Sequence, residues 1–298
     1  EDIWADTDMD FGRLDDISEV DFSLPEIDHF YFGNNGNNHL ELLLGAPGWS
    51  EPKWKGSIYP AKAKPSEFAA YYSRQFATIE FNTTYYQVPK PALMERWYDL
   101  TEPDFVFCPK MFAGISQSNS FALGDSILPD FLLRMGMLKE KLGLIYMQLP
   151  QSFSFVKLES LKKFIRQWRP GIPLAIEIRH ESYFKSQNAP VLAEEMAMAN
   201  ISWMITDVAG RRDASHSYIT APFMAIRFVA NNDESDFTRI DNWVDRLVVW
   251  QTNGVELVYF FLHTKGQPPI VLSEYLAKKW KEKSTHDIKK PTVIDREK

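Results

Sequence analysis

The sequence predicts a (β/α)8 barrel of the TIM type in a single domain, and three observations support this fold class. Eight short apolar runs recur along the chain, helical patterns separate most of them, and polar side chains follow nearly every run. Such runs are typical of parallel strands buried on both faces, and polar groups at their carboxyl ends are typical of a site on a barrel. The strand candidates are 40–46, 78–82, 105–110, 143–149, 173–179, 202–207, 223–229 and 256–262.

Amphipathic segments with recognisable start and stop residues lie between most of these runs. Pro65 and Pro91 stand where a first helical residue is expected. Gly171 and Gly254 follow the ends of two further helical patterns. The sixth crossover, 208–222, contains no convincing helix. Helices are expected after the two prolines and at 127–140, 157–168, 190–199, 240–253 and about 271–282.

A doubly wound open sheet is the alternative to the barrel. That architecture usually has fewer strands and a glycine-rich phosphate-binding turn after the first strand. Neither a Gly-x-Gly-x-x-Gly run nor a Walker-type loop occurs in the sequence. Nucleotide-binding folds of those types are therefore disfavoured.

Acidic residues are concentrated in an N-terminal extension, residues 1–38. The extension holds 11 of the 40 acidic residues but one of the 33 basic residues. The net charge of −7 therefore belongs to the extension, and the rest of the chain carries a small positive excess that suits an anionic ligand. We expect the barrel domain at 39–284 and a charged tail at 285–298.

Composition predicts a cytoplasmic protein with no membrane partner. No apolar run approaches the length of a membrane span, and the acidic N-terminus resembles neither a secretory signal nor a transit peptide. Cys108 is the single cysteine, which excludes an intrachain disulfide. It stands inside an apolar run, so we expect a buried thiol.

Strand alternation predicts which of the polar side chains meet. Glu177 and Arg179 share one face of their strand, and Glu80 and Asn82 share one face of theirs. A charge facing the apolar helix layer would be very costly. We therefore expect Glu80, Glu177, Arg179 and Arg227 to point into the barrel interior. The alternative is that they serve only as structural ion pairs, Glu177 with Arg179 and Glu80 with Arg227.

The first functional hypothesis is a pocket at the carboxyl ends of the strands that binds a small anionic or sugar-like molecule, bearing phosphate or carboxylate. Glu80 and Glu177 are the acid/base candidates, because burial beside cations tunes a carboxyl pKa. Asp207, which closes the sixth run, is the third carboxylate of the catalytic set.

Three cations are candidates for holding the acidic group of the ligand. Lys110, Arg179 and Arg227 can each bind phosphate or carboxylate, and arginine often does so with two hydrogen bonds. Further candidates would orient, bridge or stack on the ligand from strand ends and adjoining loops: Asn82, Gln148, Trp49, Tyr59, Tyr85, His180 and His263.

A metal-dependent phosphodiesterase or isomerase is the second hypothesis. Glu80, Glu177, His180, Asp207 and His263 are of the residue types that bind divalent metals. Two candidate histidines are few for zinc, and a magnesium or manganese site built mainly from carboxylates fits better. We assign no metal site, and the cofactor stays unknown.

The third hypothesis is a non-catalytic protein that binds nucleic acid or another partner. Four lysines interleave with aromatic residues after the first strand, which is typical of a nucleic-acid-binding surface. A solvated loop explains the same stretch equally well. The residues are Lys53, Lys55, Lys62 and Lys64 with Trp54 and Tyr59.

An ordered set of short motifs resembles the family named as domain of unknown function 72, the YecE-like proteins. The motifs are GAPGWS at 45–50, EFNTTYY at 80–86, PDF at 103–105, LP at 149–150 and EIRH at 177–180. The resemblance covers roughly 41–263 and implies a TIM-type barrel, similar to sugar-isomerase and endonuclease-IV-like barrels, without implying an activity. The residues shared with the family pattern are Glu80, Asn82, Lys110, Glu177, Arg179 and Asp207.

Overall fold

The computed structural model describes residues 11–27, 30–32, 39–168 and 171–294, and parallel strands alternate with helices through most of them. The strands of this described part are β1 (Glu41–Ala46), β2 (Thr78–Phe81), β3 (Val106–Pro109), β4 (Ile145–Gln148), β5 (Leu174–Glu177), β6 (Ser202–Trp203), β7 (Ile205–Asp207), β8 (Phe223–Val229) and β9 (Leu257–His263).

The α-helices lie in the crossovers between strands and after β9. They are α1 (Phe68–Gln75), α2 (Thr83–Tyr86), α3 (Pro91–Leu100), α4 (Ala113–Ser116), α5 (Ile127–Met135), α6 (Leu158–Gln167), α7 (Ala189–Met198), α8 (Ser235–Thr252) and α9 (Ile270–Ser284). Short 3-10 helices are η1 (Pro52–Trp54), η2 (Pro65–Glu67), η3 (Gly136–Lys141), η4 (Phe155–Lys157), η5 (Glu181–Phe184) and η6 (Arg212–Ala214).

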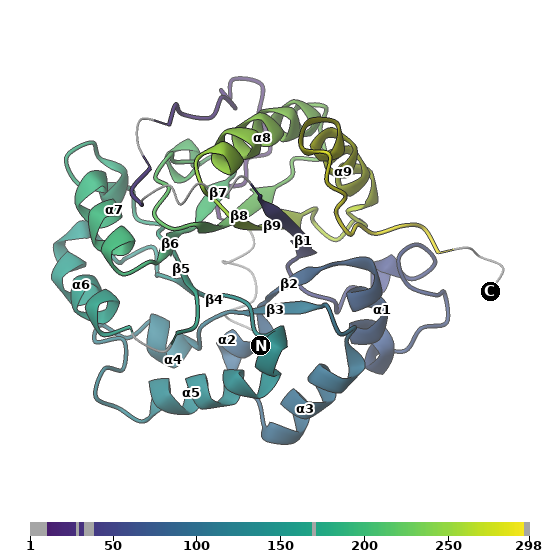
Figure 1. The fold of residues 1–298 in the computed structure, drawn as a ribbon, viewed down its shortest axis with the longest axis horizontal. Coiled ribbons are helices and arrows are strands. Elements are labelled where there is room, and N and C mark those ends of the chain that lie inside the picture. Colours follow the sequence, from purple (N-terminus) through teal and green to yellow (C-terminus); the bar gives the residue numbers. More distant parts are fainter. Residues whose placement is uncertain (1–10, 28–29, 33–38, 169–170, 295–298) are drawn as a thin grey trace.

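The strands form two parallel sheets. One sheet has the order β3-β2-β1-β9-β8-β7 and the other has the order β4-β5-β6. Isolated bridges, one of them between Lys110 and Tyr146, link the β3 side to β4. On the other side β6 runs into β7 across Met204, whose N–H donates to the carbonyl of Ile176 at 3.0 Å. The strands surround a common centre with the helices outside them (Figure 1). The predicted α/β class with parallel strands is therefore confirmed.

The predicted elements differ from the observed ones mainly at their ends. The sixth run is split into β6 and β7, and the second and fifth runs leave the strand earlier than expected, at Phe81 and Glu177. The sixth crossover contains η6 but no α-helix, as its sequence predicts. Among the helices of the described residues, none is long and apolar enough to span a membrane.

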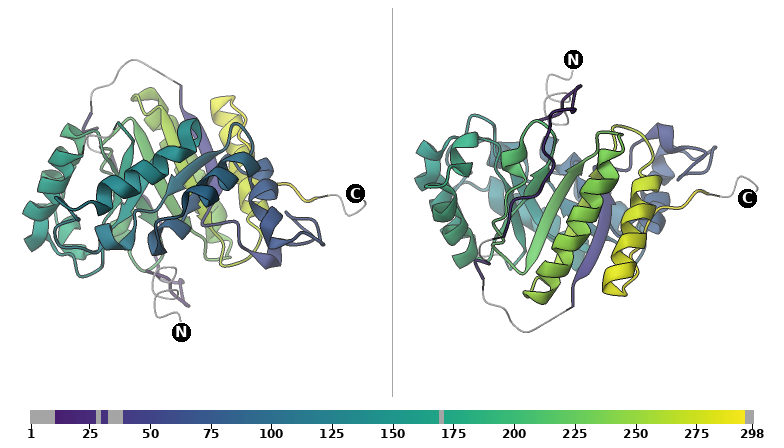
Figure 2. Two further views of the ribbon diagram at one scale, coloured as in Figure 1. Left: turned by 90° about the horizontal axis from the view of Figure 1, so that it is seen from below. Right: turned by 90° about the horizontal axis from the view of Figure 1, so that it is seen from above.

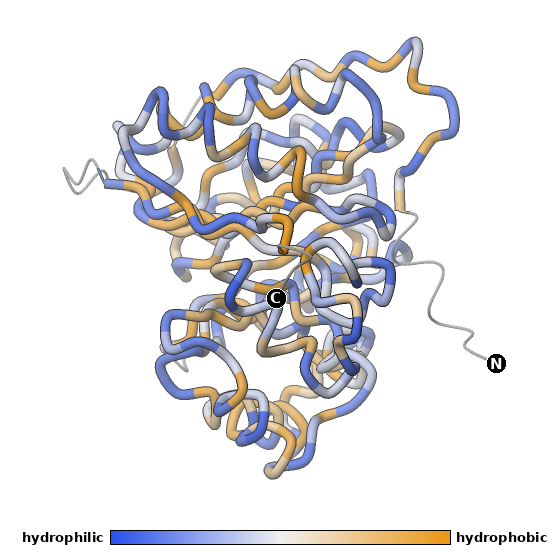
Figure 3. Tube along the Cα trace, turned by 90° about the vertical axis from the view of Figure 1, so that its right-hand side faces the viewer, coloured by the Kyte–Doolittle hydropathy of each residue, from blue (hydrophilic) through white to orange (hydrophobic). Residues whose placement is uncertain are grey.

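Strand alternation divides the core into two layers. Side chains such as Ile176, Ile226 and Phe260 face the helices and belong to the large core. The alternate side chains form a smaller inner cluster at the centre of the strands: Cys108, Leu144, Tyr146, Ala175, Met204, Ala225, Tyr259 and Phe261. Hydrophobic residues accordingly dominate the central strands in Figure 3, and polar residues alternate with them along the helices. Burial raises the pKa of the Cys108 thiol to about 12, as expected for a thiol that packs as a small apolar group.

The described part of the extension covers the place where the sixth crossover supplies no α-helix. The ring of Phe22 lies 4.9 Å from the guanidinium of Arg239 in α8. The carbonyl of Pro25 accepts a hydrogen bond from Arg246, also in α8. Figure 2 shows the segment running alongside α8. The extension therefore packs on the body of the protein; residues 1–10 and the Gly/Asn run 33–38 lie outside the described residues.

The residues that follow α9 also lie against the body. The N–H of Thr292 donates to Oε1 of Gln75 at 2.9 Å, and the N–H of Ile294 donates to the carbonyl of Ser57 at 2.7 Å. The first ten residues of the charged tail are therefore attached near α1, and residues 295–298 lie outside the described part of the chain.

His216 is a buried histidine held in its neutral form. Its Nδ1 accepts the N–H of Tyr218 at 3.2 Å, so the ring proton is on Nε2, which donates to the carbonyl of Met204 at 3.2 Å. The ring also packs on Trp203, with centroids 4.5 Å apart. Burial lowers the pKa of His216 to about 3.

We expect this histidine to make the protein less stable in mild acid. The unfolded chain takes up the His216 proton near pH 6.5 and the folded chain only near pH 3, so the free energy of unfolding falls as pH falls between these values, by up to about 1.4 kcal/mol per pH unit. Urea unfolding at pH 7 and pH 5 should show a smaller loss in His216→Gln than in wild type. His286→Gln is the control, and equal losses in wild type and His216→Gln would contradict the prediction.

Candidate functional site

Four strands deliver ionisable side chains to one place at the carboxyl end of the inner cluster. Glu80 of β2, Glu177 of β5, Arg227 of β8 and His263 of β9 alternate with residues of the helix-facing core, so they point inward. Nη2 of Arg227 lies 2.8 Å from Oε1 of Glu80, and Nη1 lies 2.5 Å from Oε1 of Glu177. Nε2 of His263 lies 2.7 Å from Oε2 of Glu80. We call these four residues the inner charge cluster.

Three polar residues extend the inner charge cluster. Oη of Tyr146 lies 2.7 Å from Oδ1 of Asn82 and 3.2 Å from Oε1 of Glu80. Thr206 donates its hydroxyl to Oε1 of Glu177 at 2.7 Å. Asn82 does not share a strand face with Glu80, contrary to the sequence-based expectation, because the strand ends at Phe81 and Asn82 adopts a helical conformation.

Opposed effects set the charge state of the cluster. Burial would raise the pKa of Glu80, but Arg227 and His263 outweigh burial and hold that pKa well below its usual range. Burial would lower the pKa of Arg227, but the carboxylates of Glu177 and Glu80 outweigh it and raise that pKa well above its usual range. Glu80 and Arg227 are therefore both charged at neutral pH, although each is almost completely buried.

Asp207 lies outside this cluster, so the structure does not bring it together with Glu80 and Glu177, the other two carboxylates of the predicted catalytic set. It follows Thr206, so its side chain points to the opposite face of the strand, toward α8. Oδ2 of Asp207 accepts the indole N–H of Trp243 at 2.8 Å, and Oδ1 lies 3.1 Å from Nη2 of Arg239. Burial would raise the pKa of Asp207, but Arg239 and Arg212 outweigh it and lower the pKa. Asp207 therefore anchors α8 to the strands.

The other two predicted cations and the buried amide lie at the edge of the cluster. Nη2 of Arg179 is 3.4 Å from Oε2 of Glu177. Nζ of Lys110 lies 4.3 Å from the ring centroid of Tyr85. Gln148 is buried at the end of β4. Arg179 thus contacts the cluster directly, whereas Lys110 pairs with Tyr146 and Gln148 with Glu177 in the strand register.

Two of the candidate residues in loops, Tyr59 and His180, make packing or hydrogen-bonding contacts within the protein. Tyr59 has no exposed surface, stacks on Phe68 with centroids 4.8 Å apart, and donates its hydroxyl to the carbonyl of Trp49 at 2.8 Å. Nδ1 of His180 accepts the N–H of Ser182 at 3.1 Å at the start of η5. Packing and helix capping account for these two side chains, so their expected contact with a ligand is not supported.

The basic and aromatic stretch after β1 lacks exposed rings. Trp54 is 4% exposed and Tyr59 is 0% exposed. Bases of a single-stranded nucleic acid stack on accessible aromatic faces. The lysines around these two residues therefore have no stacking surface beside them, which removes the feature that favoured nucleic acid.

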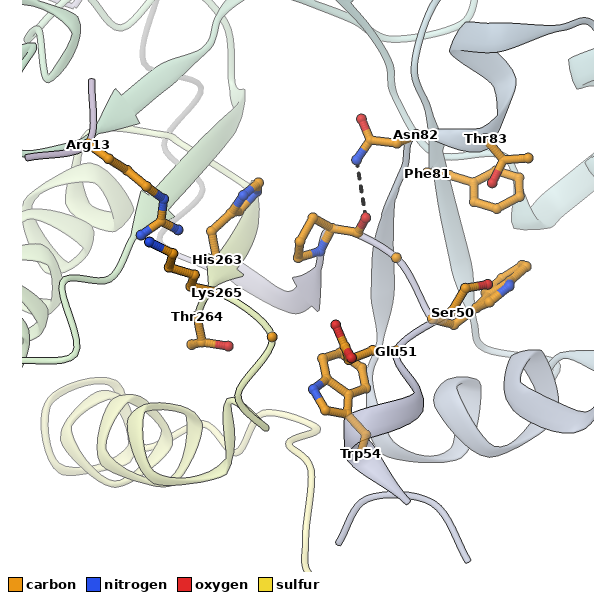
Figure 4. Close-up of a pocket in the computed structure, with 14 residues that line it drawn as sticks. Arg13, Ser50, Glu51, Trp54, Phe81, Asn82, Thr83, His263, Thr264 and Lys265 are labelled. Carbon is orange, nitrogen blue, oxygen red and sulfur yellow. Dashed lines mark hydrogen bonds between the residues drawn. The ribbon is translucent and has the colours of Figure 1, made fainter. Parts of the chain in front are cut away.

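A pocket of about 410 Å³ opens beside the inner charge cluster (Figure 4). His263 belongs both to its wall and to the cluster, and Asn82, which extends the cluster, also lines the pocket. Arg13 of the extension and Lys265 after β9 also line it, and their side chains point toward one another beside His263. Further lining residues are Trp49, Ser50, Glu51, Trp54, Thr83 and Thr264.

The sequence could have indicated some of the site residues that were missed. Tyr146 stands two residues before Gln148, so alternation places both on one face, and Thr206 is the inward neighbour of Asp207. Lys265 follows the eighth run after His263 and Thr264. Arg13 donates a hydrogen bond to the carbonyl of Ala230, which is 217 residues away, and no local pattern indicates such a contact.

A metal site is not assembled by the proposed ligands. In the parts of the chain that the structure describes, no group of three or more His, Cys, Asp or Glu side chains could hold a metal ion. Glu80 and His263 meet each other, but Glu177 is bound by Arg227 and Asp207 faces α8. The donor set therefore does not fit a resident divalent metal.

Comparisons with known proteins agree with this architecture. The YecE protein (UPF0759) of Escherichia coli, from strains O157:H7 and K12, is 29% identical over 243 residues, which are 75% of this chain and 86% of YecE. A DUF72 family structure from Enterococcus faecalis aligns with a TM-score of 0.64 at 18% identity, over 86% of this chain and 100% of the other. A second, from Thermotoga maritima, aligns with a TM-score of 0.61 at 24% identity, over 83% and 100%. At these identities the structures show similarity of fold.

The family comparison covers most of the body of the protein. The description "Protein of unknown function DUF72" matches residues 43–295, from within β1 to the tail after α9. The matched region contains the inner charge cluster and every lining residue of the pocket named above except Arg13. The chain therefore belongs to the DUF72 family.

Proposed function

We propose that this protein binds a small anionic or sugar-like molecule in the pocket beside the inner charge cluster and performs acid/base chemistry on it. One observation carries the proposal. His263 lines the pocket, and its Nε2 is hydrogen-bonded at 2.7 Å to the buried, charged carboxylate of Glu80. Histidine is the most frequent general acid or base in enzymes, and a carboxylate behind the ring fixes its orientation.

The carboxylates take roles that differ from the initial hypothesis. Glu80 is 1% exposed and would act through His263 as a positioning residue. Glu177 has no exposed surface and bonds Arg227, so it would hold the guanidinium in place between the two carboxylates. His263 would be the group that exchanges a proton with the ligand.

The wall of the pocket suits an oxygen-rich ligand. Ser50, Thr83 and Thr264 place hydroxyl-bearing residues on it, and Lys265 adds a positive charge. Hydroxyl and amide groups recognise sugar hydroxyls by hydrogen bonding, and a lysine recognises phosphate or carboxylate. A phosphorylated or oxidised sugar combines both features.

We also infer that the two sheets close into one barrel, as the sequence predicts. The isolated bridges between β3 and β4 and the continuity of β6 with β7 support closure. A cytoplasmic location stays a prediction, and it rests on the use of a single, buried cysteine.

Calorimetric titration tests the proposal. Wild type is titrated with glucose 6-phosphate, gluconate and glucose, and we expect at least one of them to bind. The affinity for that ligand should be about tenfold or more lower in His263→Gln, because a buried polar contact with the ligand is lost. Glu80→Gln should also weaken binding, since it removes the carboxylate that orients His263. His286→Gln is the control. Binding of none of the three, or equal binding by wild type and His263→Gln, would refute the proposal.

A further inference from the structure

We propose that residues 11–13 of the extension complete the pocket, and that Arg13 is the residue that selects ligands carrying a phosphate or carboxylate. The inference rests on the proposed function and names the substrate class of the same site. Arg13 lines the pocket beside His263 and Lys265, and its side chain points toward Lys265 (Figure 4).

Specific contacts hold this segment over the carboxyl ends of the strands. Phe11 is 7% exposed, and its ring lies 4.4 Å from the guanidinium of Arg179 and 5.0 Å from that of Arg211. The carbonyl of Gly12 accepts the N–H of Gly210 at 2.7 Å. Nη1 of Arg13 donates to the carbonyl of Ala230 at 3.2 Å. Three successive residues are thus attached to three different strand ends, which fixes the place of the Arg13 side chain.

Two glycines allow the close approach of these chain segments. Gly12 has a φ of +70°, and a Cβ atom there would lie 2.8 Å from Cγ1 of Val208. A Cβ atom at Gly210 would lie 2.8 Å from the carbonyl oxygen of Gly12. A side chain at either position would push the segment outward. The fit is therefore specific to the residues present.

The charges around Arg13 favour an anionic ligand. Among residues 1–38, Arg13 is the one basic residue beside 11 acidic residues, and it lines the same pocket as a second cation, Lys265. Arginine and lysine are the residue types that bind phosphate and carboxylate, and both line this pocket. Glu51 contributes one carboxylate to the same wall.

A buried donor in the same wall also points to a ligand with acceptor atoms. Nε1 of Trp54 has no hydrogen-bond acceptor among the described residues, although it is buried and Trp54 lines the pocket. A buried indole N–H normally finds an acceptor. An oxygen of a phosphate, carboxylate or sugar hydroxyl would supply it.

The preference for acidic ligands would come from a segment of this chain that lies outside the region matched to the family. The family match covers residues 43–295, so Arg13 is not among the matched positions. His263 and Lys265 lie inside the matched region. The extension would thereby add acid selectivity to a pocket whose proton-transferring group belongs to the barrel.

The test compares acidic and neutral ligands. Full-length wild type, Arg13→Gln and the control Arg96→Gln, which removes an exposed charge on α3, are titrated with glucose 6-phosphate and glucose. We expect Arg13→Gln to lower the affinity for glucose 6-phosphate about tenfold or more and to leave the affinity for glucose within about twofold of the wild-type value. Gly12→Ala should reproduce this pattern, because it displaces the segment that carries Arg13.

The outcomes separate the two proposals. If wild type binds both sugars and Arg13→Gln binds both as wild type does, or loses both equally, the role of Arg13 is refuted and the proposed function stands. If wild type binds none of glucose 6-phosphate, gluconate and glucose, both proposals fail. The ¹H–¹⁵N signal of the Trp54 indole, assigned with Trp54→Phe, supplies a local readout: it should shift when glucose 6-phosphate binds to wild type, and an unchanged signal would contradict the placement of the ligand.

Discussion

Replacing Arg227 by methionine is expected to lower the free energy of unfolding by about 3–5 kcal/mol. Arg227 is 5% exposed and bonds two carboxylates, Glu80 and Glu177, that are themselves buried. Without the guanidinium both carboxylates would face each other in a medium of low polarity, and each would take up a proton or distort the strands. Urea unfolding followed by circular dichroism measures the loss.

Two further variants separate charge from packing. Arg227→Lys keeps a positive charge but cannot reach both carboxylates with a planar fork, so we expect an intermediate loss. The triple variant with Arg227→Met, Glu80→Gln and Glu177→Gln removes every charge of the trio, and we expect it to regain most of the stability, because neutral replacements of buried ion groups are often tolerated. A loss below about 1 kcal/mol in Arg227→Met would contradict the arrangement described.

The triple variant also decides between the two interpretations of the cluster. Structural ion pairs alone would predict a stable protein that binds glucose 6-phosphate as wild type does. The proposed function predicts a stable protein that has lost the orientation of His263 and therefore binds or reacts differently. Retained stability with altered ligand binding would show that the charges are kept for function.

Alternation along strands explains why much of the cluster could be predicted. Glu80, Glu177 and Arg227 each stand inside or at the end of an apolar run, where the identity of the neighbours shows which face is helix-facing. Asp207 also stands at the end of an apolar run, but its side chain belongs to the helix-facing side of the strand. Because side chains alternate, an inward-facing Thr206 implies an outward-facing Asp207. A polar residue at a strand end is therefore a candidate site residue only if strand alternation also places its side chain on the inward face.

The pocket itself could be predicted only in part from local patterns. Trp49, Asn82 and His263 were expected to contact a ligand and do line it. Its acidic wall residue Glu51 and its two cations come from loops and from the extension, and loop paths depend on contacts that are distant in the sequence. The segment that carries Arg13 reaches Ala230, which is 217 residues away. The extension is acidic in composition, yet the apolar Phe11 and the pair Gly12 and Gly210 attach it to the strand ends.

Replacing Asp207 by alanine is expected to lower the free energy of unfolding by about 3–5 kcal/mol while leaving the pocket intact. The substitution removes the acceptor of the Trp243 indole N–H and the partner of Arg239, which is 1% exposed. Arg239 would keep Asp236 and the carbonyl of Val229 as partners, so the lower end of the range is favoured. Asp207→Asn, which preserves size and one acceptor, should lose less.

The measurement is urea unfolding together with glucose 6-phosphate titration at a temperature where the variant is folded. Thr206→Val is the matched comparison, because Thr206 is the adjacent residue on the inward face and donates to Glu177. We expect Thr206→Val to lower the free energy of unfolding by only about 1 kcal/mol but to change the affinity for the ligand. Asp207→Ala should lower the free energy of unfolding more and leave the affinity unchanged. A folded Asp207→Ala protein with weakened ligand binding would contradict this assignment. Thr206 and Asp207 lie on opposite faces of the strand, so both could act on the same ligand only if the strand faces described above were wrong.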